Sequence, residues 1–213
     1  MHEETPTQTP WTAEFWDERY GSKDRVWSGN PNPQLEREVA DLAPGRALDA
    51  GSGEGADAIW LARRGWRVTA LDISAVALER GAAHAGPELA DRITWQRADL
   101  LDWTPHDQRY DLVSAHFLHL PSELRARVYA NLAASVADGG TLLVVGHHPS
   151  DLQTTMGRPN LPDLMFTAEQ LAAALEEERW EVVTAESRGR PAIDPEGREI
   201  TISDAVLRAR RLA

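Results

Sequence analysis

Apolar and polar positions follow two periods along most of this chain, which predicts strands alternating with helices. From Arg46 onward, apolar runs such as A-L-D-A-G and R-V-T-A-L-D-I have the length of buried strands. Between such runs, apolar residues recur every three or four positions. In the helix predicted from Ser122 to Gly139-Gly140, for example, Val128 and Leu132 share one face. This alternation predicts right-handed crossovers and a parallel sheet covered on both faces.

The carboxyl-terminal part departs from this alternation. Thr167 and Gln170 form a capping box for a helix that we predict to run to about Glu178. The segments W-E-V-V-T-A-E and I-T-I-S-D-A-V-L-R-A then read as two strands with no helical stretch between them. We therefore predict a terminal hairpin, so that the sheet is parallel except for its last strand.

The amino-terminal part is predicted to lie outside the alternating pattern. Residues 1–10 are polar and rich in Pro and Thr, which predicts disorder. Residues 11–33 combine an aromatic helix capped by Thr12 with a loop rich in Gly, Asn and Pro, and this unit is a natural lid. Residues 34–213 form a single α/β domain, which opens with a helix from near Gln34 to Pro44-Gly45.

Charge and composition narrow the classes of partner. The formal net charge of -12 and the pI near 5.0 disfavour nucleic acid and anionic membrane surfaces. The absence of cysteine excludes disulfides, thiolate metal sites and cysteine nucleophiles. With neither a signal peptide nor a membrane span in the sequence, we expect a cytoplasmic protein.

The strongest local motif is L-D-A-G-S-G-E-G-A-D-A at 48–58, a strand that runs into a glycine turn and a helix. Gly51 and Gly53 permit the close backbone approach that a bound nucleoside needs, although the turn also satisfies the loose dinucleotide fingerprint. A plain packing turn is the structural alternative. Asp49 and Glu54 oppose an anionic pyrophosphate. The same carboxylates suit S-adenosylmethionine, which has no phosphate and carries a sulfonium and an ammonium group.

Two further aspartates follow the next two predicted strands. Asp72 ends A-L-D-I, where a carboxylate can accept hydrogen bonds from both ribose hydroxyls. Asp99, in A-D-L, can accept from the adenine amino group, with Ile73 and Leu100 flanking the ring. Taken singly, each aspartate is typical of a helix cap or turn. Their joint placement at successive strand ends favours a nucleoside site.

These motifs, together with Y-D-L-V-S-A-H-F-L and G-G-T-L-L-V-V-G, resemble class I S-adenosylmethionine-dependent methyltransferases over about residues 34–212. The short link between the third and fourth strands and the aromatic amino-terminal helix are similar to the small-molecule branch with thiopurine and tellurite-resistance-type enzymes. The resemblance implies a Rossmann-like, doubly wound, seven-stranded sheet in the order 3-2-1-4-5-7-6. It also implies methyl transfer to a small-molecule acceptor, with S-adenosylhomocysteine as the product.

The resemblance further implies a set of cofactor contacts at the carboxyl ends of the strands. The methionine part is bordered by the glycine turn and by the end of the fourth strand, and the ribose and adenine by the second and third strand ends. The implied residues are Asp49, Ala50, Gly51, Ser52, Gly53, Asp72, Ile73, Asp99, Leu100, Ala115 and His116.

Four of the seven histidines lie where the acceptor is expected, after the fourth and fifth strands: His116, His119, His147 and His148. A neutral imidazole can contact the acceptor or remove its proton, and we take His119 and His148 as candidate general bases. Purely structural roles are an alternative. A metal site is a further one, but H-x-x-H from a strand into a loop gives it little support, and we predict no metal.

Aromatic and basic side chains complete the predicted acceptor side. Trp16, Tyr20 and Trp27 can box an aromatic or cationic acceptor, or simply pin the amino-terminal helix to the domain. Arg188, Arg190 and Arg198, on the loop predicted within the hairpin, suit an acidic acceptor or are solvated charges.

Two rival functions share part of this pattern. A nicotinamide-dependent oxidoreductase shares the glycine turn and Asp72, but not the acidic residues at the turn or the antiparallel last strand. A noncatalytic S-adenosylmethionine-binding protein shares every cofactor residue. Both a monomer and a homodimer are compatible with the sequence.

Overall fold

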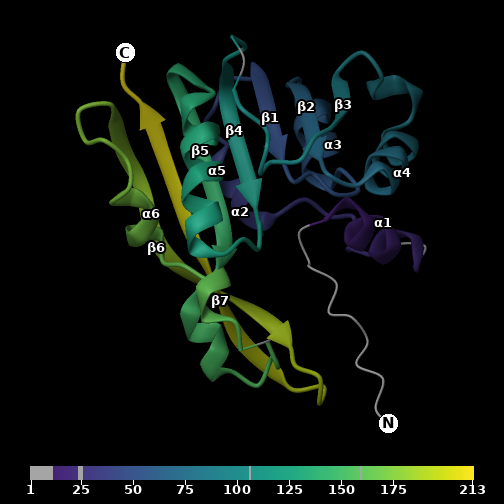
Figure 1. The fold of residues 1–213 in the computed structure, drawn as a ribbon, viewed down its shortest axis with the longest axis vertical. Coiled ribbons are helices and arrows are strands. Elements are labelled where there is room, and N and C mark those ends of the chain that lie inside the picture. Colours follow the sequence, from purple (N-terminus) through teal and green to yellow (C-terminus); the bar gives the residue numbers. More distant parts are fainter. Residues whose placement is uncertain (1–11, 24–25, 106, 159) are drawn as a thin grey trace.

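A central seven-stranded sheet organises the computed structural model, which describes residues 12–23, 26–105, 107–158 and 160–213. The strand order is β3-β2-β1-β4-β5-β7-β6 (Figure 1). The pairs are parallel except that β7 runs antiparallel to both β5 and β6. The predicted fold class, strand order and terminal hairpin are thus confirmed. The strands are β1 (Arg46–Ala50), β2 (Arg67–Asp72), β3 (Ile93–Arg97), β4 (Tyr110–His116), β5 (Val136–His147), β6 (Trp180–Ile193) and β7 (Glu199–Arg211).

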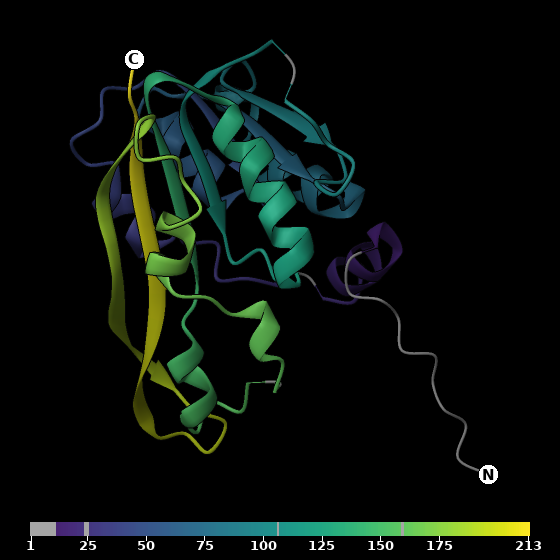
Figure 2. The same cartoon turned by 60° about the vertical axis from the view of Figure 1, so that its left-hand side comes forward.

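Helices cover both faces of the sheet, and Figure 2 shows α5 and α6 together on one of them. On the other face α2, α3 and the end of α4 contribute to a separate apolar core. The described helices are α1 (Ala13–Gly21), α2 (Pro33–Glu38), α3 (Ala56–Arg63), α4 (Ala75–Ala85), α5 (Ser122–Ala134) and α6 (Ala168–Ala172), with the 3-10 turns η1 (Pro87–Leu89), η2 (Pro149–Gln153) and η3 (Pro162–Leu164). Among these helices, none is long and apolar enough to cross a membrane.

Several predicted helix ends were wrong. The helix from Ser122 ends at Ala134, because β5 begins at Val136 and takes Gly139 and Gly140 into its irregular first part. The capping box of Thr167 is present, but its helix ends at Ala172, well before Glu178. The helix near Gln34 is likewise short and ends at Glu38. Apolar periodicity continues past each of these ends, so it did not mark the last turn.

The terminal hairpin is longer than predicted and reaches beyond the rest of the sheet. β5 pairs with β7 only as far as His147 and Asp204, whereas β6 and β7 pair on to Ile193 and Glu199. Pro191 is accommodated because β6 is an edge strand. We call residues 148–158, 160–165 and 187–203 the lobe; it projects at the bottom of Figure 1.

Candidate functional site

The turn between β1 and α3 has a backbone that glycine adopts easily. Gly51, Gly53 and Gly55 have φ angles of 75°, 52° and 79°, in the left-handed region. The N–H groups of Gly51 and Ser52 both donate to the carbonyl oxygen of Leu71, at 2.8 and 3.0 Å, and so tie the turn to the end of β2. Without β-carbons, the turn leaves room for the Leu118 side chain at Gly51 and for the Tyr20 hydroxyl at Gly53.

Buried polar atoms without partners gather at this turn. Asp49 is only 2% exposed at the end of β1. Burial and the neighbouring Asp57 carboxylate raise the pKa of Asp49 to about 7. Among the described residues, Oδ2 of Asp49, Oγ of Ser52 and Nε2 of His116 are buried without a hydrogen-bond partner. Such atoms are costly unless a ligand or water satisfies them, and a carboxylate there suits a cationic group.

His116 and Asp57 form a close pair beside Asp49. Nδ1 of His116, at the end of β4, lies 2.6 Å from Oδ2 of Asp57 in the first turn of α3. Burial alone would lower the pKa of His116, but the charge and hydrogen bond of Asp57 raise it overall. The predicted contacts Asp49, Ala50 and Ser52 therefore lie on strand and turn next to His116, whereas Asp57 was missed because it reads as an ordinary first-turn residue of a helix.

Asp72 joins the end of β2 to the glycine turn. Its Oδ2 accepts from the N–H of Gly53 and its Oδ1 from the N–H of Ser74, both at 2.8 Å. Burial raises the pKa of Asp72 despite these hydrogen bonds. A carboxylate has about four acceptor positions, so the predicted contact with ribose hydroxyls stays open to it.

An open hollow of about 650 Å³ lies at the ends of β2 and β3. Ile73 and Asp99 both line it, so the structure brings these two predicted residues together. Leu101 lines it as well, in place of the predicted Leu100, and both leucines pack against the apolar core. Oδ1 of Asp99 accepts from the N–H of Leu101 at 2.8 Å, which fixes the backbone of the turn after β3. The first residues of α1, Thr12, Ala13 and Glu14, form the opposite wall.

The aromatic residues of the amino-terminal segment gather over the glycine turn. Nε1 of Trp27 donates to the hydroxyl of Tyr20 at 3.0 Å, and the Trp16 and Tyr20 rings are 5.9 Å apart. The Tyr20 hydroxyl would lie 2.7 Å from a β-carbon added to Gly53. The guanidinium of Arg19 lies over the rings of both Trp16 and Trp27. The structure thus brings the three predicted aromatic residues together, beside the residues predicted to bind the cofactor.

Carboxylates hold this segment in place along its length. Asp17 accepts from the Ser74 hydroxyl at 2.5 Å, and Asp57 accepts from the N–H of Asn32 at 2.6 Å. Glu54 accepts from the N–H groups of Val26 and Trp27 and pairs with Arg80 at 3.3 Å. Glu54 therefore anchors the segment and is neutralised by an arginine, so the acidity at the turn comes from Asp49 rather than from Glu54.

The remaining predicted histidines separate into two groups. The rings of His119 and His147 stack 5.1 Å apart, with Phe117 against His147 at 4.6 Å. Burial first, and then the charge of Arg158, lowers the pKa of both histidines, that of His147 to about 3. His148 turns away, since its Nδ1 accepts from the N–H of Ser150 at the start of η2. Its role as a base stays a prediction.

The hairpin arginines lie on strands or at the turn between them, not on a long loop, and each has a partner. Arg188 pairs with Glu38 at 2.6 Å, Arg190 with Asp204 at 2.9 Å and Arg198 with Asp194 at 2.8 Å. Arg158 was missed, because one arginine in a long loop carries no periodic signal. Among the described residues, no three His, Asp or Glu side chains come together as a metal site.

Comparison with known proteins identifies related sequences. Residues 47–140 match the family model described as a methyltransferase domain. A relative from Mycobacteroides abscessus, 2-heptyl-1-hydroxyquinolin-4(1H)-one methyltransferase, is 30% identical over 123 residues. The match covers 56% of this chain and 54% of that protein, so the chain spans about half the length of the curated relative.

Solved structures share the whole fold. The protein described for conversion of a disulfide bond into a thioacetal group during echinomycin biosynthesis has a TM-score of 0.74 at 23% identity, covering 94% of this chain and 92% of that one. N-methyltransferase NodS from Bradyrhizobium japonicum WM9, in complex with S-adenosyl-l-homocysteine, has a TM-score of 0.69 at 19% identity, covering 94% and 98%. The predicted Rossmann-like methyltransferase fold is confirmed, and the finer tellurite-resistance-type similarity stays a prediction.

Proposed function

We propose that this chain, which carries a methyltransferase domain in residues 47–140 and has the class I methyltransferase fold, transfers a methyl group from S-adenosylmethionine to a small-molecule acceptor. The observation that carries the proposal is the set of unpartnered buried atoms of Asp49, Ser52 and His116 around the glycine turn. A carboxylate, a hydroxyl and an imidazole suit the charged groups of an amino acid moiety, and the carboxylate repels a diphosphate.

The residues of the site divide the work of binding. Asp49 and His116 hold the charged groups of the methionine part, Asp72 accepts from the ribose, and Ile73 and Asp99 border the adenine. When bound, S-adenosylmethionine supplies a methyl carbon already activated by the sulfonium, and the carbon–sulfur bond breaks as the acceptor's electron pair forms the new bond. The protein then contributes alignment and exclusion of water, for which the Tyr20–Trp27 pair over the turn serves as a lid.

Calorimetry with S-adenosylhomocysteine and with NADH tests the cofactor assignment. We expect micromolar-range binding of S-adenosylhomocysteine and none of NADH, and Asp72→Asn should weaken that binding. Asp138→Asn is the matched control, because Asp138 is an exposed carboxylate at the start of β5. Binding of NADH in place of the sulphur nucleoside would contradict the proposal.

Formation of S-adenosylhomocysteine from S-adenosylmethionine tests catalysis. The relative's name makes 2-heptyl-1-hydroxyquinolin-4(1H)-one the first acceptor to try, within a panel of hydroxyl, amine and thiol compounds. Cofactor binding without turnover on any member would favour the noncatalytic binding protein. The cytoplasmic location and the monomer or homodimer expected from the sequence belong to the same proposal.

A further inference from the structure

Arg158 is a partly buried cation of the lobe with an incomplete set of partners. Its side chain is 21% exposed, and its guanidinium lies 3.5 Å from Oδ2 of Asp151. This contact is long, and Nε of Arg158 has no hydrogen-bond acceptor among the described residues. Oδ1 of Asp151 already accepts from the N–H of Ser203 at 2.7 Å. The guanidinium therefore has donors left for a ligand.

Uncharged imidazoles lie near this cation. The stacked rings belong to His147, at the end of β5, and to His119, shortly after β4. Asp151 joins Arg158 to this point of the sheet, because it accepts from the N–H of Ser203, whose carbonyl oxygen accepts from the N–H of His148. The charge of Arg158 accordingly lowers the pKa of both rings. Both rings are consequently neutral near pH 7. Nδ1 of His147 is buried and has no hydrogen-bond partner in the described part of the chain. Two neutral rings beside a guanidinium add hydrogen-bonding capacity without cancelling its charge.

The other charged groups around these rings leave the balance positive. The charge of Arg190 also lowers the pKa of His147, and that of Arg19, on α1, lowers the pKa of His119. Asp204 and Asp151, each only 1% exposed, pair with Arg190 and Arg158, so Arg19 supplies the remaining positive charge. This positive site is unexpected in a chain with a net charge of -12, and it would attract an anion locally.

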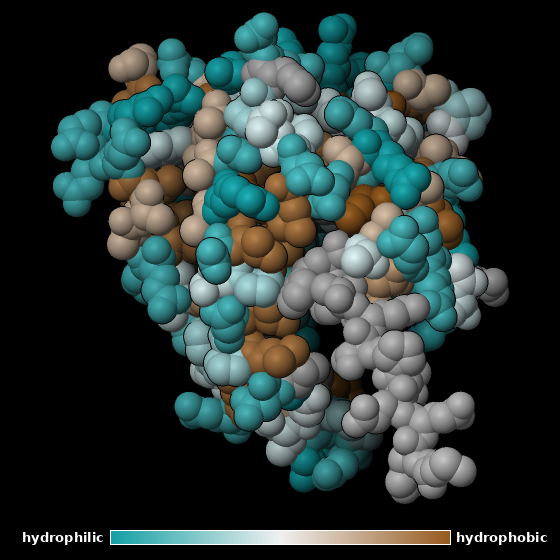
Figure 3. Space-filling view, viewed as in Figure 1, coloured by the Kyte–Doolittle hydropathy of each residue, from teal (hydrophilic) through white to brown (hydrophobic). Residues whose placement is uncertain are grey.

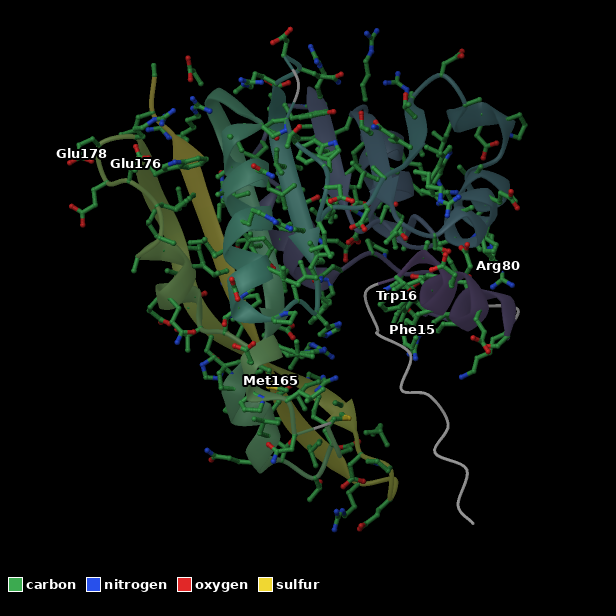
Figure 4. The ribbon with its side chains drawn as sticks, in the orientation of Figure 1. Phe15, Trp16, Arg80, Met165, Glu176 and Glu178 are labelled. Atoms are coloured by element: carbon green, nitrogen blue, oxygen red, sulfur yellow. The ribbon has the colours of Figure 1, made fainter. Side chains whose placement is uncertain are left out.

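A short segment connects this positive site to the glycine turn. Phe117 has a φ of 54°, a conformation that among the described residues is otherwise confined to glycine, and it turns the chain at the end of β4. His116 then faces Asp57 and the side chain of Leu118 packs over Gly51, while His119 stacks on His147. Figure 4 places Phe15 and Trp16 on the side of α1 toward the lobe, and Figure 3 shows apolar side chains gathered between α5 and the lobe.

We propose that Arg158 binds an ionised oxygen of the acceptor, so that the acceptor is an acidic hydroxyl or carboxylate compound with an apolar body. The inference rests on the proposed methyl transfer and assigns its acceptor side. In this proposal the acidic turn holds a cationic methyl donor, and Arg158 holds an anionic acceptor. An oxygen that arrives ionised leaves no proton for a protein base to remove, which fits the capping role of His148.

Calorimetry on the full chain saturated with S-adenosylhomocysteine tests this inference with two matched pairs of probes. The pairs are 4-nitrophenol with 4-nitroanisole, and 2-naphthoate with 2-naphthamide, measured at pH 8. We expect the ionised member of at least one pair to bind about 10- to 100-fold more tightly than its neutral partner. The two pairs separate a phenol-type oxygen from a carboxylate.

Variants of Arg158 separate direct contact from general charge. Arg158→Met should abolish the preference for the ionised probe and leave the affinity for S-adenosylhomocysteine unchanged. Arg158→Lys should keep part of the preference for the ionised probe. Arg198→Met is the control, since Arg198 is 53% exposed in the same lobe. Equal affinity within both pairs, no binding of any probe, or a preference that survives Arg158→Met would overturn the inference. Failure to bind S-adenosylhomocysteine would instead overturn the proposed function.

Discussion

The glycine turn and the lobe lie at the same edge of the sheet but are built differently. The turn comes from one continuous strand–turn–helix segment, and its chemistry is acidic through the buried Asp49. The lobe is assembled from two segments, joined by contacts such as Asp151 with Ser203 and Thr155 with Asp194. The group that we propose for acceptor binding there is a cation, Arg158. If both proposals hold, cofactor recognition is encoded locally, whereas acceptor recognition depends on contacts distant in sequence.

The largest effect is expected for substitution of Asp49, which should change ligand affinity and folding stability in opposite directions. Asp49→Asn should weaken S-adenosylhomocysteine by about 100-fold, because a charge-assisted hydrogen bond contributes about 3 kcal/mol. The same variant should unfold at a higher temperature at pH 8, since the raised pKa of Asp49 means that its ionised form opposes folding. Calorimetry and thermal unfolding measure the two effects, with Asp138→Asn as control. A variant that loses both affinity and stability would show that Asp49 is structural.

A pair of glycine substitutions compares the backbones of the two regions. Gly53→Ala should cost about 1 to 3 kcal/mol, because φ is 52° and the new β-carbon would lie 2.7 Å from the Tyr20 hydroxyl. Gly189→Ala, in the lobe hairpin, would meet only the Thr201 methyl group at 3.1 Å and should cost less than about 1 kcal/mol. Denaturant unfolding measures both, and equal costs would remove the contrast.

The pH dependence of cofactor binding sharpens the electrostatic side of the comparison. Asp49 has a pKa of about 7 in the absence of ligand, and a cationic group binds its ionised form. Binding should therefore release a proton below pH 7, and affinity should fall by up to about tenfold per pH unit there. Calorimetry from pH 8 to pH 5.5 measures this slope, which Asp49→Asn should flatten. A slope retained in that variant would assign it to another group.

The smallest effect is expected within the lobe. The Thr155 hydroxyl and the N–H and guanidinium of Arg198 hold the pKa of Asp194 below its usual range. Because this pKa is lower in the folded state than in the unfolded state, ionised Asp194 stabilises the fold above about pH 4. That stabilisation is lost as the pH falls below this value. Hydrogen exchange should show roughly fivefold lower protection of lobe amides in Asp194→Asn at pH 6. Amides of β1 and β2 should be unchanged, as should both regions in the exposed control Glu181→Gln.

The same contrast explains what could be predicted from sequence. The turn, the strand order and the positions of Asp72 and Asp99 followed from local motifs and from the resemblance. The ends of α5 and α6 could not be predicted from the sequence, because the strand pairing of Val136 and the turns after Ala172 override apolar periodicity. The anchoring role of Glu54 and the incomplete pairing of Arg158 could not be predicted either, because both depend on partners, such as Val26 and Asp151, that the sequence does not identify.

The carboxylates of Asp17, Glu54 and Asp57 tie the amino-terminal segment to α4, the glycine turn and α3 through backbone and hydroxyl hydrogens. In the proposed complex, this segment covers the methionine end of the nucleoside through Tyr20 and Trp27, so we expect its detachment to accompany release. For the proposed reaction, release of S-adenosylhomocysteine would then limit the turnover rate. Shortening the amino-terminal segment would speed the exchange of S-adenosylhomocysteine for S-adenosylmethionine and leave the rate of methyl transfer in the bound state unchanged.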